Sequence, residues 1–329
     1  MDLDQKILLN EMQRDVKISV VIPVYNRPDE LTRALHSVLE QTFRDFEVIV
    51  VDDGSTANIQ SVCQSFKDAR IRFVRNEAHS NANVARNIGI RESKGEYVSM
   101  LDSDDEFLPE HLAHRLLKIK EWGCDGIFGS AYIDYGAHRV LSLSRPLRTG
   151  ELMINYLLSD GFAPTPSHFY KREAALAILW DESLDRHQDF DFTLRFSKKF
   201  SFRCDIEPTV LVNWKAGEKR TIKYDSCIRF INHHKAEILP RVYNFYHRSM
   251  YSHVQRNAVI DRNVERHYAV NSYKYIYAVP FSEFVFVHKT RRIFHGFLFA
   301  KFILLHILFF IRALFTRDAF RDIVGSGRY

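Results

Sequence analysis

The chain has 329 residues with a net charge of +5, and its hydrophobic content of 46% is that of a folded protein. This length is enough for one large core or two smaller ones. Its four cysteines lie far apart without a C-x-x-C pair, which disfavours a zinc site or a disulfide framework. Residues 1–15 are charged and lack the apolar core of a signal peptide, so we expect an N-terminal extension and a cytoplasmic protein.

The positive charge is concentrated near the C-terminus. Residues 281–329 carry eight Lys and Arg against three acidic residues, a surplus equal to the net charge of the whole chain. Because this surplus lies in an apolar segment, it favours an anionic membrane surface as a partner over nucleic acid.

From Lys17 to Asp105 the chain alternates between β-branched or apolar runs and segments with helical spacing. The predicted strands are 17–24, 46–51, 71–74 and the run that begins at Tyr97, and the predicted helices between them centre on 31–39, 59–66 and 83–92. Such alternation predicts an α/β protein with a doubly wound, mostly parallel sheet flanked by helices.

Polar side chains follow three of these strands. Tyr25 and Asn26 follow the first strand, Asp52 and Asp53 follow the second, and Asp102, Asp104 and Asp105 follow the fourth. Ligands of doubly wound sheets bind beyond the carboxyl ends of the strands, so these side chains predict a site. The Asp102-x-Asp104 spacing suits one shared divalent cation, although a solvated acidic turn before a helix from Pro109 is the simpler alternative.

Two common nucleotide-binding patterns are absent from the sequence. It has no G-x-x-x-x-G-K-[ST] loop, and its glycines near Gly126 do not form G-x-G-x-x-G after a strand. A nucleotidyltransferase would need a Gly-rich, basic triphosphate loop after the first strand, where the chain instead reads Tyr-Asn-Arg-Pro.

Several segments in order resemble family 2 glycosyltransferases, which have the GT-A fold. They are Ile18-Ser-Val-Val-Ile-Pro-Val-Tyr-Asn26, Ser37-Val-Leu-Glu-Gln-Thr42, Val50-Val-Asp-Asp-Gly-Ser55, Ala85-Arg-Asn-Ile-Gly89 and Gly95-Glu-Tyr through Leu101-Asp-Ser-Asp-Asp105. The resemblance implies a GT-A catalytic domain at 16–222, with a nucleotide-binding half at 16–110 and an acceptor half at 111–222. It also implies inverting sugar transfer from a nucleotide-diphosphate donor, a UDP-sugar in our prediction, with Mn²⁺ or Mg²⁺.

The resemblance assigns roles to individual residues of the first half. It implies that Pro23 and Tyr25 line the base pocket, that Asp53 accepts a hydrogen bond from the uracil imide, and that Asp52 supports that turn. Asp102 is expected to hold the ribose or a metal-bound water and to share the cation with Asp104, which ligates the metal that bridges the phosphates. Arg86 either reaches the donor phosphates or is an ordinary surface residue. Residues 78–83 lack glycines often found there in the family, which leaves the loop contact open.

In the second half, Gln188-Asp189 begins a predicted helix and resembles the family's acidic motif, where many relatives have Glu at the position of Gln188. The resemblance makes Asp189 the general base that removes the acceptor hydroxyl proton. The alternative is that Asp189 only caps the helix, and Asp191 has an equally simple role as the i+4 partner of Arg195. Residues 164–168 form either an acceptor-side loop or a connector, residues 201–212 read as two strands, and Trp214 either stacks on a sugar or lies in a surface loop.

Residues 223–329 are predicted to form a helical, membrane-associating extension. Between 287 and 317 the basic residues and histidines fall on one side of a helix whose other side is Phe, Leu and Ile. Lys301 and Arg312 interrupt the apolar run, so an amphipathic helix in the bilayer interface is favoured over a transmembrane span. A buried core or dimer helix is the other alternative.

The sequence therefore predicts a metal-dependent inverting glycosyltransferase with a nucleotide-sugar donor and a glycan or lipid-linked acceptor. We expect it to act in cell-surface polysaccharide synthesis, peripherally attached to the inner face of the membrane. The alternative is a catalytically inactive sugar-nucleotide-binding or scaffold protein. The sequence does not define the oligomeric state.

Overall fold

A computed structural model describes residues 16–214, 223–256 and 261–272. The chain divides into two compact units between His234 and Lys235. The predicted N-terminal extension at 1–15 and the predicted amphipathic segment at 287–317 lie outside the described residues.

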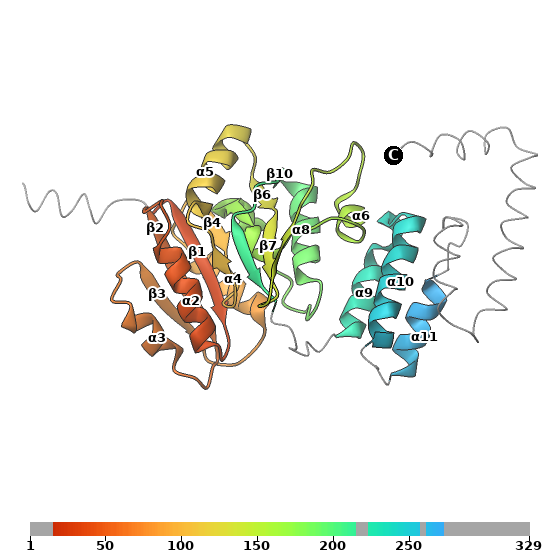
Figure 1. The fold of residues 1–329 in the computed structure, drawn as a ribbon, viewed down its shortest axis with the longest axis horizontal. Helices are drawn as coiled ribbons and strands as arrows, with labels where there is room; N and C mark the ends of the chain where they lie inside the picture. Colours follow the sequence, from red (N-terminus) through yellow and green to blue (C-terminus); the bar gives the residue numbers. More distant parts are fainter. Residues whose placement is uncertain (1–15, 215–222, 257–260, 273–329) are drawn as a thin grey trace, which may run out of the picture. The chain divides into compact units, whose positions relative to one another are not determined.

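The first unit is built on a seven-stranded sheet in the order β10-β6-β9-β4-β1-β2-β3 within the described residues. Its strands are β1 (Ile18–Val24), β2 (Phe46–Asp53), β3 (Ile71–Asn76), β4 (Tyr97–Met100), β6 (Gly126–Gly129), β9 (Phe169–Lys171) and β10 (Phe202–Asp205). Strands β1 to β4 pair in parallel, and β9 runs antiparallel between β4 and β6. The predicted mostly parallel α/β sheet is confirmed, and Figure 1 shows β1, β2 and β3 side by side.

The strands at 46–51 and 71–74 are each two residues longer than predicted. Asp52 and Asp53 remain in the ladder because they pair in register with Arg75 and Asn76 of β3. The last two residues of each strand are polar, so a prediction from hydrophobicity alone places the end of each strand too early.

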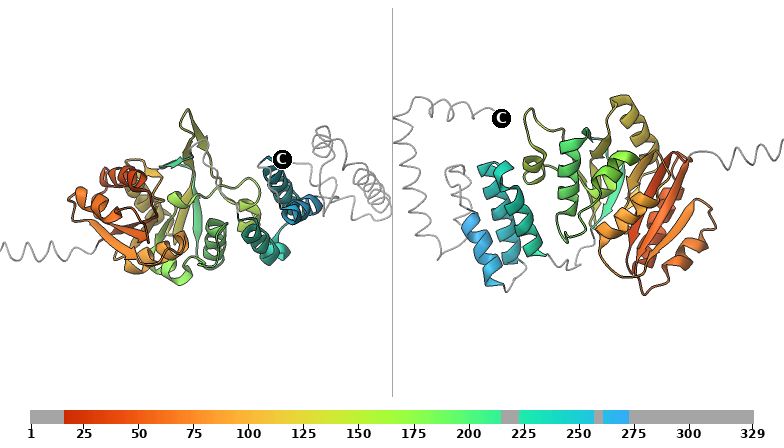
Figure 2. Two further views of the ribbon diagram at one scale, coloured as in Figure 1. Left: turned by 90° about the horizontal axis from the view of Figure 1, so that it is seen from below. Right: turned by 180° about the vertical axis from the view of Figure 1, so that it is seen from behind.

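Helices cover both faces of the sheet, as Figures 1 and 2 show from opposite sides. On one face lie α2 (Pro28–Leu39), α3 (Ile59–Ser65) and α5 (His111–Trp122), and on the other lie α4 (Ala82–Glu92), α7 (Arg172–Ile178) and α8 (Gln188–Lys199). Successive side chains of β1 point to opposite faces of the sheet, with Val20 in the core of the first face and Val21 in that of the second.

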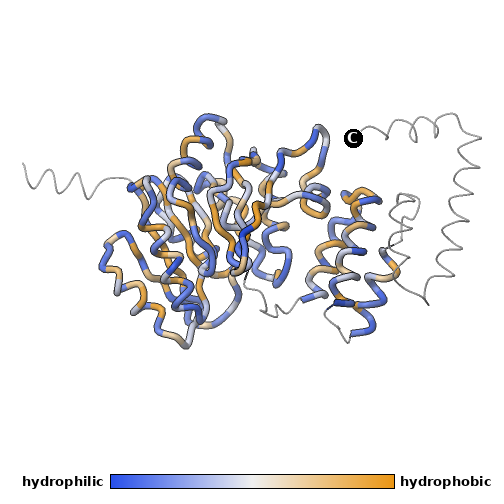
Figure 3. The backbone as a smooth tube through the Cα atoms, in the orientation of Figure 1, coloured by the Kyte–Doolittle hydropathy of each residue, from blue (hydrophilic) through white to orange (hydrophobic). Residues whose placement is uncertain are grey.

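Gly89 lets α4 approach β1 closely, because a Cβ there would lie 2.3 Å from a Val21 methyl group. Figure 3 shows the apolar residues that run along these strands.

A smaller sheet in the order β5-β11-β7-β8 extends the first unit. It contains β5 (Glu106–Phe107), β7 (Ala131–Asp134), β8 (Arg139–Ser142) and β11 (Val210–Asn213), and α6 (Met153–Leu157) and the 3-10 turn η1 (Thr165–Ser167) precede β9. The two strands predicted within 201–212 are present, but β10 belongs to the large sheet and β11 to the small one. The helix expected from Pro109 begins at His111, because the Pro109 carbonyl accepts a hydrogen bond from Thr42 N outside the helix.

The helix α9 (Tyr224–His234) belongs to the first unit, which therefore extends beyond the predicted domain end at residue 222. Ser226 Oγ accepts a hydrogen bond from Arg186 N at 3.3 Å, and the Phe230 ring contacts the His187 ring. The helix α9 therefore packs beside the start of α8. The second unit contains η2 (Lys235–Glu237), α10 (Pro240–Arg256) and α11 (Arg262–Asn271), joined by the bond from Tyr243 to Asn271. In the described ranges no helix has the length and hydrophobicity that crossing a membrane requires.

A buried ion pair joins α5 to β10. Arg115 is fully buried, and its Nη1 donates to Asp205 Oδ2 at 2.6 Å, while His114 Nε2 lies 2.6 Å from the same oxygen. Burial of a guanidinium is costly unless a carboxylate compensates its charge.

We predict that Asp205→Ala destabilises the protein by about 3–5 kcal/mol, because it leaves the Arg115 charge buried without its carboxylate. The change is measured as the shift of the urea unfolding midpoint. Glu121→Ala is the control, because Glu121 pairs with Lys118 at the surface. A shift no larger than that of the control would show that the buried pair adds little to stability.

Candidate active site

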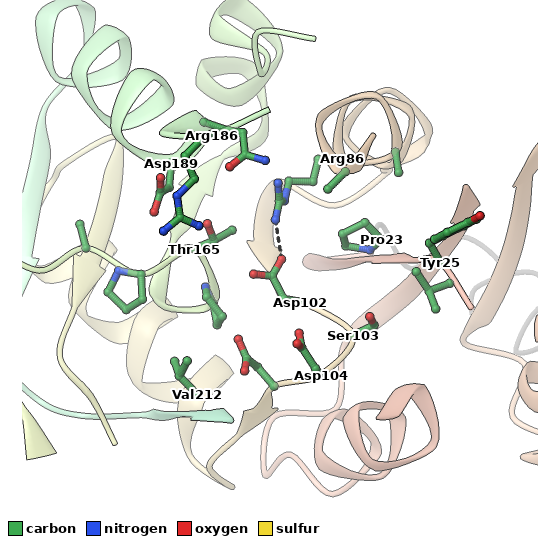
Figure 4. Close-up of a pocket in the computed structure, with 18 of the residues that line it drawn as sticks. Pro23, Tyr25, Arg86, Asp102, Ser103, Asp104, Thr165, Arg186, Asp189 and Val212 are labelled. Atoms are coloured by element: carbon green, nitrogen blue, oxygen red, sulfur yellow. Dashed lines mark hydrogen bonds and ion pairs between the residues drawn. The ribbon is translucent and has the colours of Figure 1, made fainter. Parts of the chain in front are cut away.

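A cavity of about 660 Å³ opens at the carboxyl edge of β1, β2 and β4. This volume is in the range of small-molecule sites. Figure 4 shows Asp189 and Arg186 on one side, Tyr25 on the other, and Asp102 and Asp104 between them. The residues predicted for the site that line this cavity are Pro23, Tyr25, Asp53, Arg86, Asp102, Asp104 and Asp189.

Asp53, at the end of β2, is held by the segment that follows β3. Ser80 N donates to both carboxylate oxygens at 3.2 and 3.1 Å, and Asn76 Nδ2 donates to Oδ1 at 2.8 Å. His79 Nδ1 lies 3.0 Å from Oδ2. With Asp53 only 2% exposed, these contacts fix the carboxylate at the cavity wall.

Asp52 is fully buried and is not among the residues that line the cavity. Its Oδ2 accepts from Arg75 Nη1 at 2.5 Å, and its Oδ1 accepts from Ser55 N at 3.0 Å. The carboxylate therefore acts on the turn after β2, and does not line the space where a ligand would lie.

The ring of Tyr25 stacks on that of His79, with centroids 3.8 Å apart and an interplanar angle of 18°. Tyr25 is 41% exposed and lines the cavity, so part of its side chain is accessible to solvent there. Behind it, Asn26 adopts a positive φ of 52° and its Oδ1 accepts from Thr56 N and Ala57 N. These bonds join the loop after β1 to the loop after β2.

The carboxylates after β4 are paired with basic or amide groups. Arg86 Nη2 donates to Asp102 Oδ1 at 2.6 Å, and Arg27 Nη1 lies 2.5 Å from Asp104 Oδ2. Asp105 accepts from Asn213 N of β11 at 2.8 Å, so it ties the two sheets together. Asp102 and Asp104 line the cavity and Asp105 is buried, so only part of this acidic turn is exposed to solvent.

Arg86 is not a surface residue. Its side chain is almost fully buried, and its guanidinium lies 4.6 Å from the Trp180 ring centroid in a cation–π contact. The guanidinium therefore reaches the cavity from α4 in a fixed orientation.

Asp189 lies in the first turn of α8 and is half-buried. His187, at φ 61°, occupies the N-cap position without a side-chain cap hydrogen bond. Asp189 accepts from Phe190 N in the first turn, so a role in stabilising the helix start stays the alternative to that of the base. Burial raises the pKa of the Asp189 carboxyl above its ordinary value, against the opposing effects of its bond from Phe190 N and of the charges of Arg186 and Arg86. A carboxylate with a raised pKa is a stronger base, which is the property a general base requires.

Asp191, two residues on, has the structural role that its spacing indicated. Its Oδ2 accepts from Arg195 at 2.6 Å, and Arg195 also donates to the carbonyls of Ile178 and Leu179. This network attaches α8 to the end of α7.

Two asparagines of α4 hold the segment that leads into α8. Asn87 accepts from Trp180 N at 2.7 Å and donates to its carbonyl, and Asn83 donates to the carbonyls of Asp181 and Leu184. The nucleotide-side helix α4 thereby positions the chain that carries Asp189.

Sequence reasoning assigned no site role to Arg27, His79 and Arg186, which all line the cavity. Arg27 follows directly on the first predicted strand, and Arg186 precedes Gln188-Asp189, so position alone could have indicated both. His79 carried no such signal, because only folding brings its ring against Tyr25. Thr165 and Pro166 of η1 and Trp214 also line the cavity.

Comparison with known proteins agrees with this architecture. The model of the family described as "Glycosyl transferase family 2" matches residues 19–179. The amylovoran biosynthesis glycosyltransferase AmsB of Erwinia amylovora is 32% identical over 237 residues, which are 68% of this chain and 74% of that protein. Glycosyltransferase GlyG of Streptococcus pneumoniae is 38% identical over 118 residues, so the chain covers only 39% of its length.

The fold is similar to that of S. aureus TarS 1-349, solved in complex with UDP-GlcNAc. The TM-score is 0.59 at 22% sequence identity, covering 80% of this chain and 82% of that one. The fold is thus of the GT-A type. The chain belongs to glycosyl transferase family 2, and the protein is a glycosyltransferase.

We predict that Gly54→Ala disturbs the loop that holds Asp53. Gly54 has φ +75°, and a Cβ there would lie 2.7 Å from the His79 backbone nitrogen. Gly136→Ala is a matched control, because Gly136 has φ +83° but no atom within 4 Å of the added Cβ. Both variants bear left-handed strain of about 1–2 kcal/mol, and only Gly54→Ala adds overpacking of about 1–3 kcal/mol. Equal urea midpoints for the two variants would contradict the close approach.

Proposed function

We propose that this glycosyltransferase is a metal-dependent, inverting enzyme that moves a sugar from a UDP-sugar to a hydroxyl group of a glycan or lipid-linked acceptor. The observation that carries the proposal is that Asp102, Asp104, Arg86 and Asp189 line one cavity with the aromatic surface of Tyr25. The relationship to an amylovoran biosynthesis enzyme supports a role in cell-surface polysaccharide synthesis.

In this proposal the nucleotide lies at the ends of β1 and β2. The base stacks against Tyr25 near Pro23, and its imide N–H donates to Asp53, while Asp52 keeps the turn in place. A carboxylate can accept several hydrogen bonds, so the donors at Asn76 and Ser80 leave Asp53 further acceptor capacity. The complex of the related fold with UDP-GlcNAc supports uridine as the nucleoside.

The residues after β4 fit a hard divalent cation, Mn²⁺ or Mg²⁺. Asp102 and Asp104 offer carboxylate oxygens, and the part of the chain that the structure describes has no cluster of three His, Cys, Asp or Glu side chains that could hold a metal. Mg²⁺ is often held by one or two carboxylates together with substrate phosphates, which matches such a partial protein site. When bound, the cation would neutralise negative charge that develops on the diphosphate leaving group.

Asp189 acts as the general base. Its carboxylate takes the proton from the acceptor hydroxyl as that oxygen forms a bond to the anomeric carbon, and the bond from that carbon to the diphosphate oxygen breaks. Attack from the face opposite the leaving group inverts the configuration. Arg86 stabilises the departing diphosphate, so a second acidic residue is not required.

We predict that Asp189→Asn lowers sugar transfer by about 10²- to 10⁴-fold, the usual contribution of a general base, and leaves UDP affinity unchanged. Transfer is measured as UDP release with Mn²⁺ and a panel of UDP-sugars and glycan or polyprenyl acceptors, and affinity by calorimetry. Because its pKa is raised, Asp189 is protonated, and activity falls, at a higher pH than for an ordinary carboxyl group.

Asp191→Asn is the matched control for this prediction, since Asp191 is paired with Arg195 in the same helical turn. It is expected to lower stability and to keep most of the transfer rate. Transfer at the wild-type rate by Asp189→Asn would refute the assignment of the base.

We also propose that the C-terminal region attaches the enzyme to the inner face of the membrane from the cytoplasm. The support is the sequence of residues 287–317, in which basic and apolar residues separate to opposite sides of a helix. Attachment to the membrane would give the enzyme access to a lipid-linked acceptor.

The full-length protein is therefore expected to sediment with vesicles that contain anionic phosphatidylglycerol, and much less with neutral phosphatidylcholine vesicles, because its excess positive charge lies in this region. Adding salt should release it. Full recovery in the supernatant with both vesicle types would reject membrane attachment and leave the interface or core alternative.

A further inference from the structure

Both carboxylates that would hold the cation are paired with an arginine. Asp102 pairs with Arg86 at 2.6 Å, and Asp104 pairs with Arg27 at 2.5 Å. The two guanidiniums come from different elements, Arg86 from α4 and Arg27 from the residue that caps α2. In the free protein the negative charge of the Asp102-x-Asp104 motif is thus compensated by side chains of the chain itself.

The two pairs differ in their freedom to separate. The side chain of Arg86 is 8% exposed and lies against Trp180, whereas that of Arg27 is 40% exposed. The Arg27 carbonyl accepts from Leu31 N at 3.0 Å and so belongs to the start of α2. Its side chain can therefore leave Asp104 by rotation, without any change in the helix.

The Arg27 guanidinium occupies Oδ2 of Asp104 and offsets the negative charge of this carboxylate, so it competes with a divalent cation there. Cation binding at Asp104 is therefore stronger when the Arg27 guanidinium moves away. A diphosphate is a good new partner, because guanidinium groups bind phosphate oxygens through two parallel hydrogen bonds. Arg27 lines the same cavity as Asp104, so such a partner would be within its reach.

We infer that Arg27 pairs with Asp104 in the free enzyme and moves to the diphosphate of the donor, which makes cation binding and nucleotide binding cooperative. Without nucleotide, the cation must compete with Arg27 for Asp104. With nucleotide, the released guanidinium gains phosphate contacts, and the cation gains phosphate ligands. This inference rests on the proposed function, and it adds a residue that couples the two binding events.

The test is calorimetric titration of the full-length protein with Mn²⁺ alone, with UDP alone, and with UDP in saturating Mn²⁺. In Arg27→Gln, Mn²⁺ alone is expected to bind about two- to fivefold more tightly, as expected for release from a partly exposed ion pair. UDP in the presence of Mn²⁺ is expected to bind about tenfold more weakly, from the loss of a charged hydrogen bond. The factor by which Mn²⁺ strengthens UDP binding equals the factor by which UDP strengthens Mn²⁺ binding, so the substitution lowers both equally.

Arg33→Gln is the matched control. Arg33 lies on α2, the helix that Arg27 caps, and its side chain is 42% exposed and 3.9 Å from Glu106. It does not line the cavity. The substitution should leave all three titrations unchanged. Arg27→Lys, which keeps the charge but loses the planar fork, should fall between wild type and Arg27→Gln. Thermal melting of each variant verifies that it is folded.

Two results would overturn the inference while the proposed function stands. One is Mn²⁺ binding by Arg27→Gln that is no tighter than in the wild type, and the other is UDP affinity in Mn²⁺ that the substitution does not change. Wild-type protein that binds no UDP, with or without Mn²⁺, would instead refute the proposed donor and this inference with it.

Discussion

The structure depends on the compensation of negative charge at one edge of its sheet. Parallel pairing of β1, β2 and β4 brings Asp53, Asp102 and Asp104 to the same edge. Carboxylates gathered in a partly buried cavity are unfavourable unless hydrogen-bond donors or positive charges lie next to them. The protein supplies these from other elements, backbone and amide donors at Asp53 and guanidiniums at the other two. The contacts that compensate the negative charge of these carboxylates therefore also hold the loops of the site in place.

A second consequence is that the two halves of the first unit are joined through the site. Asn83 and Asn87 on α4 bind the segment that leads to α8, and Asp105 after β4 binds the backbone of β11. Asp189 keeps its position opposite Arg86 because of these bonds. Burial raises the pKa of the Asp189 carboxyl above its ordinary value. One cavity thus contains both carboxylates paired with guanidinium groups and a carboxylate whose pKa is raised.

Much of the fold was predictable from local patterns. The β-branched runs at Ile18–Val24 and Phe46–Asp53 are fully buried strands, and apolar spacing located α2, α3 and α4 between strands. The short strands β5 to β8 were not predicted, because runs of two to four residues carry no periodicity that distinguishes them from loops. The ion-pair partners of the carboxylates, such as Arg75 for Asp52 and Arg27 for Asp104, were not predictable either. The two members of each pair lie on different elements, and only the packing of those elements brings them together.

The sequence by itself determined the alternation of strands and helices, the family, and which carboxylates stand at strand ends, because these follow from residue type and short spacing. The tertiary structure alone decided which of those carboxylates face the cavity and which donors and cationic side chains surround them. Asp52 and Asp53 are neighbours in sequence, yet a strand directs successive side chains to opposite sides, so one supports the turn and the other lines the cavity. Contacts across the sheet edge, such as His79 on Tyr25, come into existence only when parallel strands bring separate loops together.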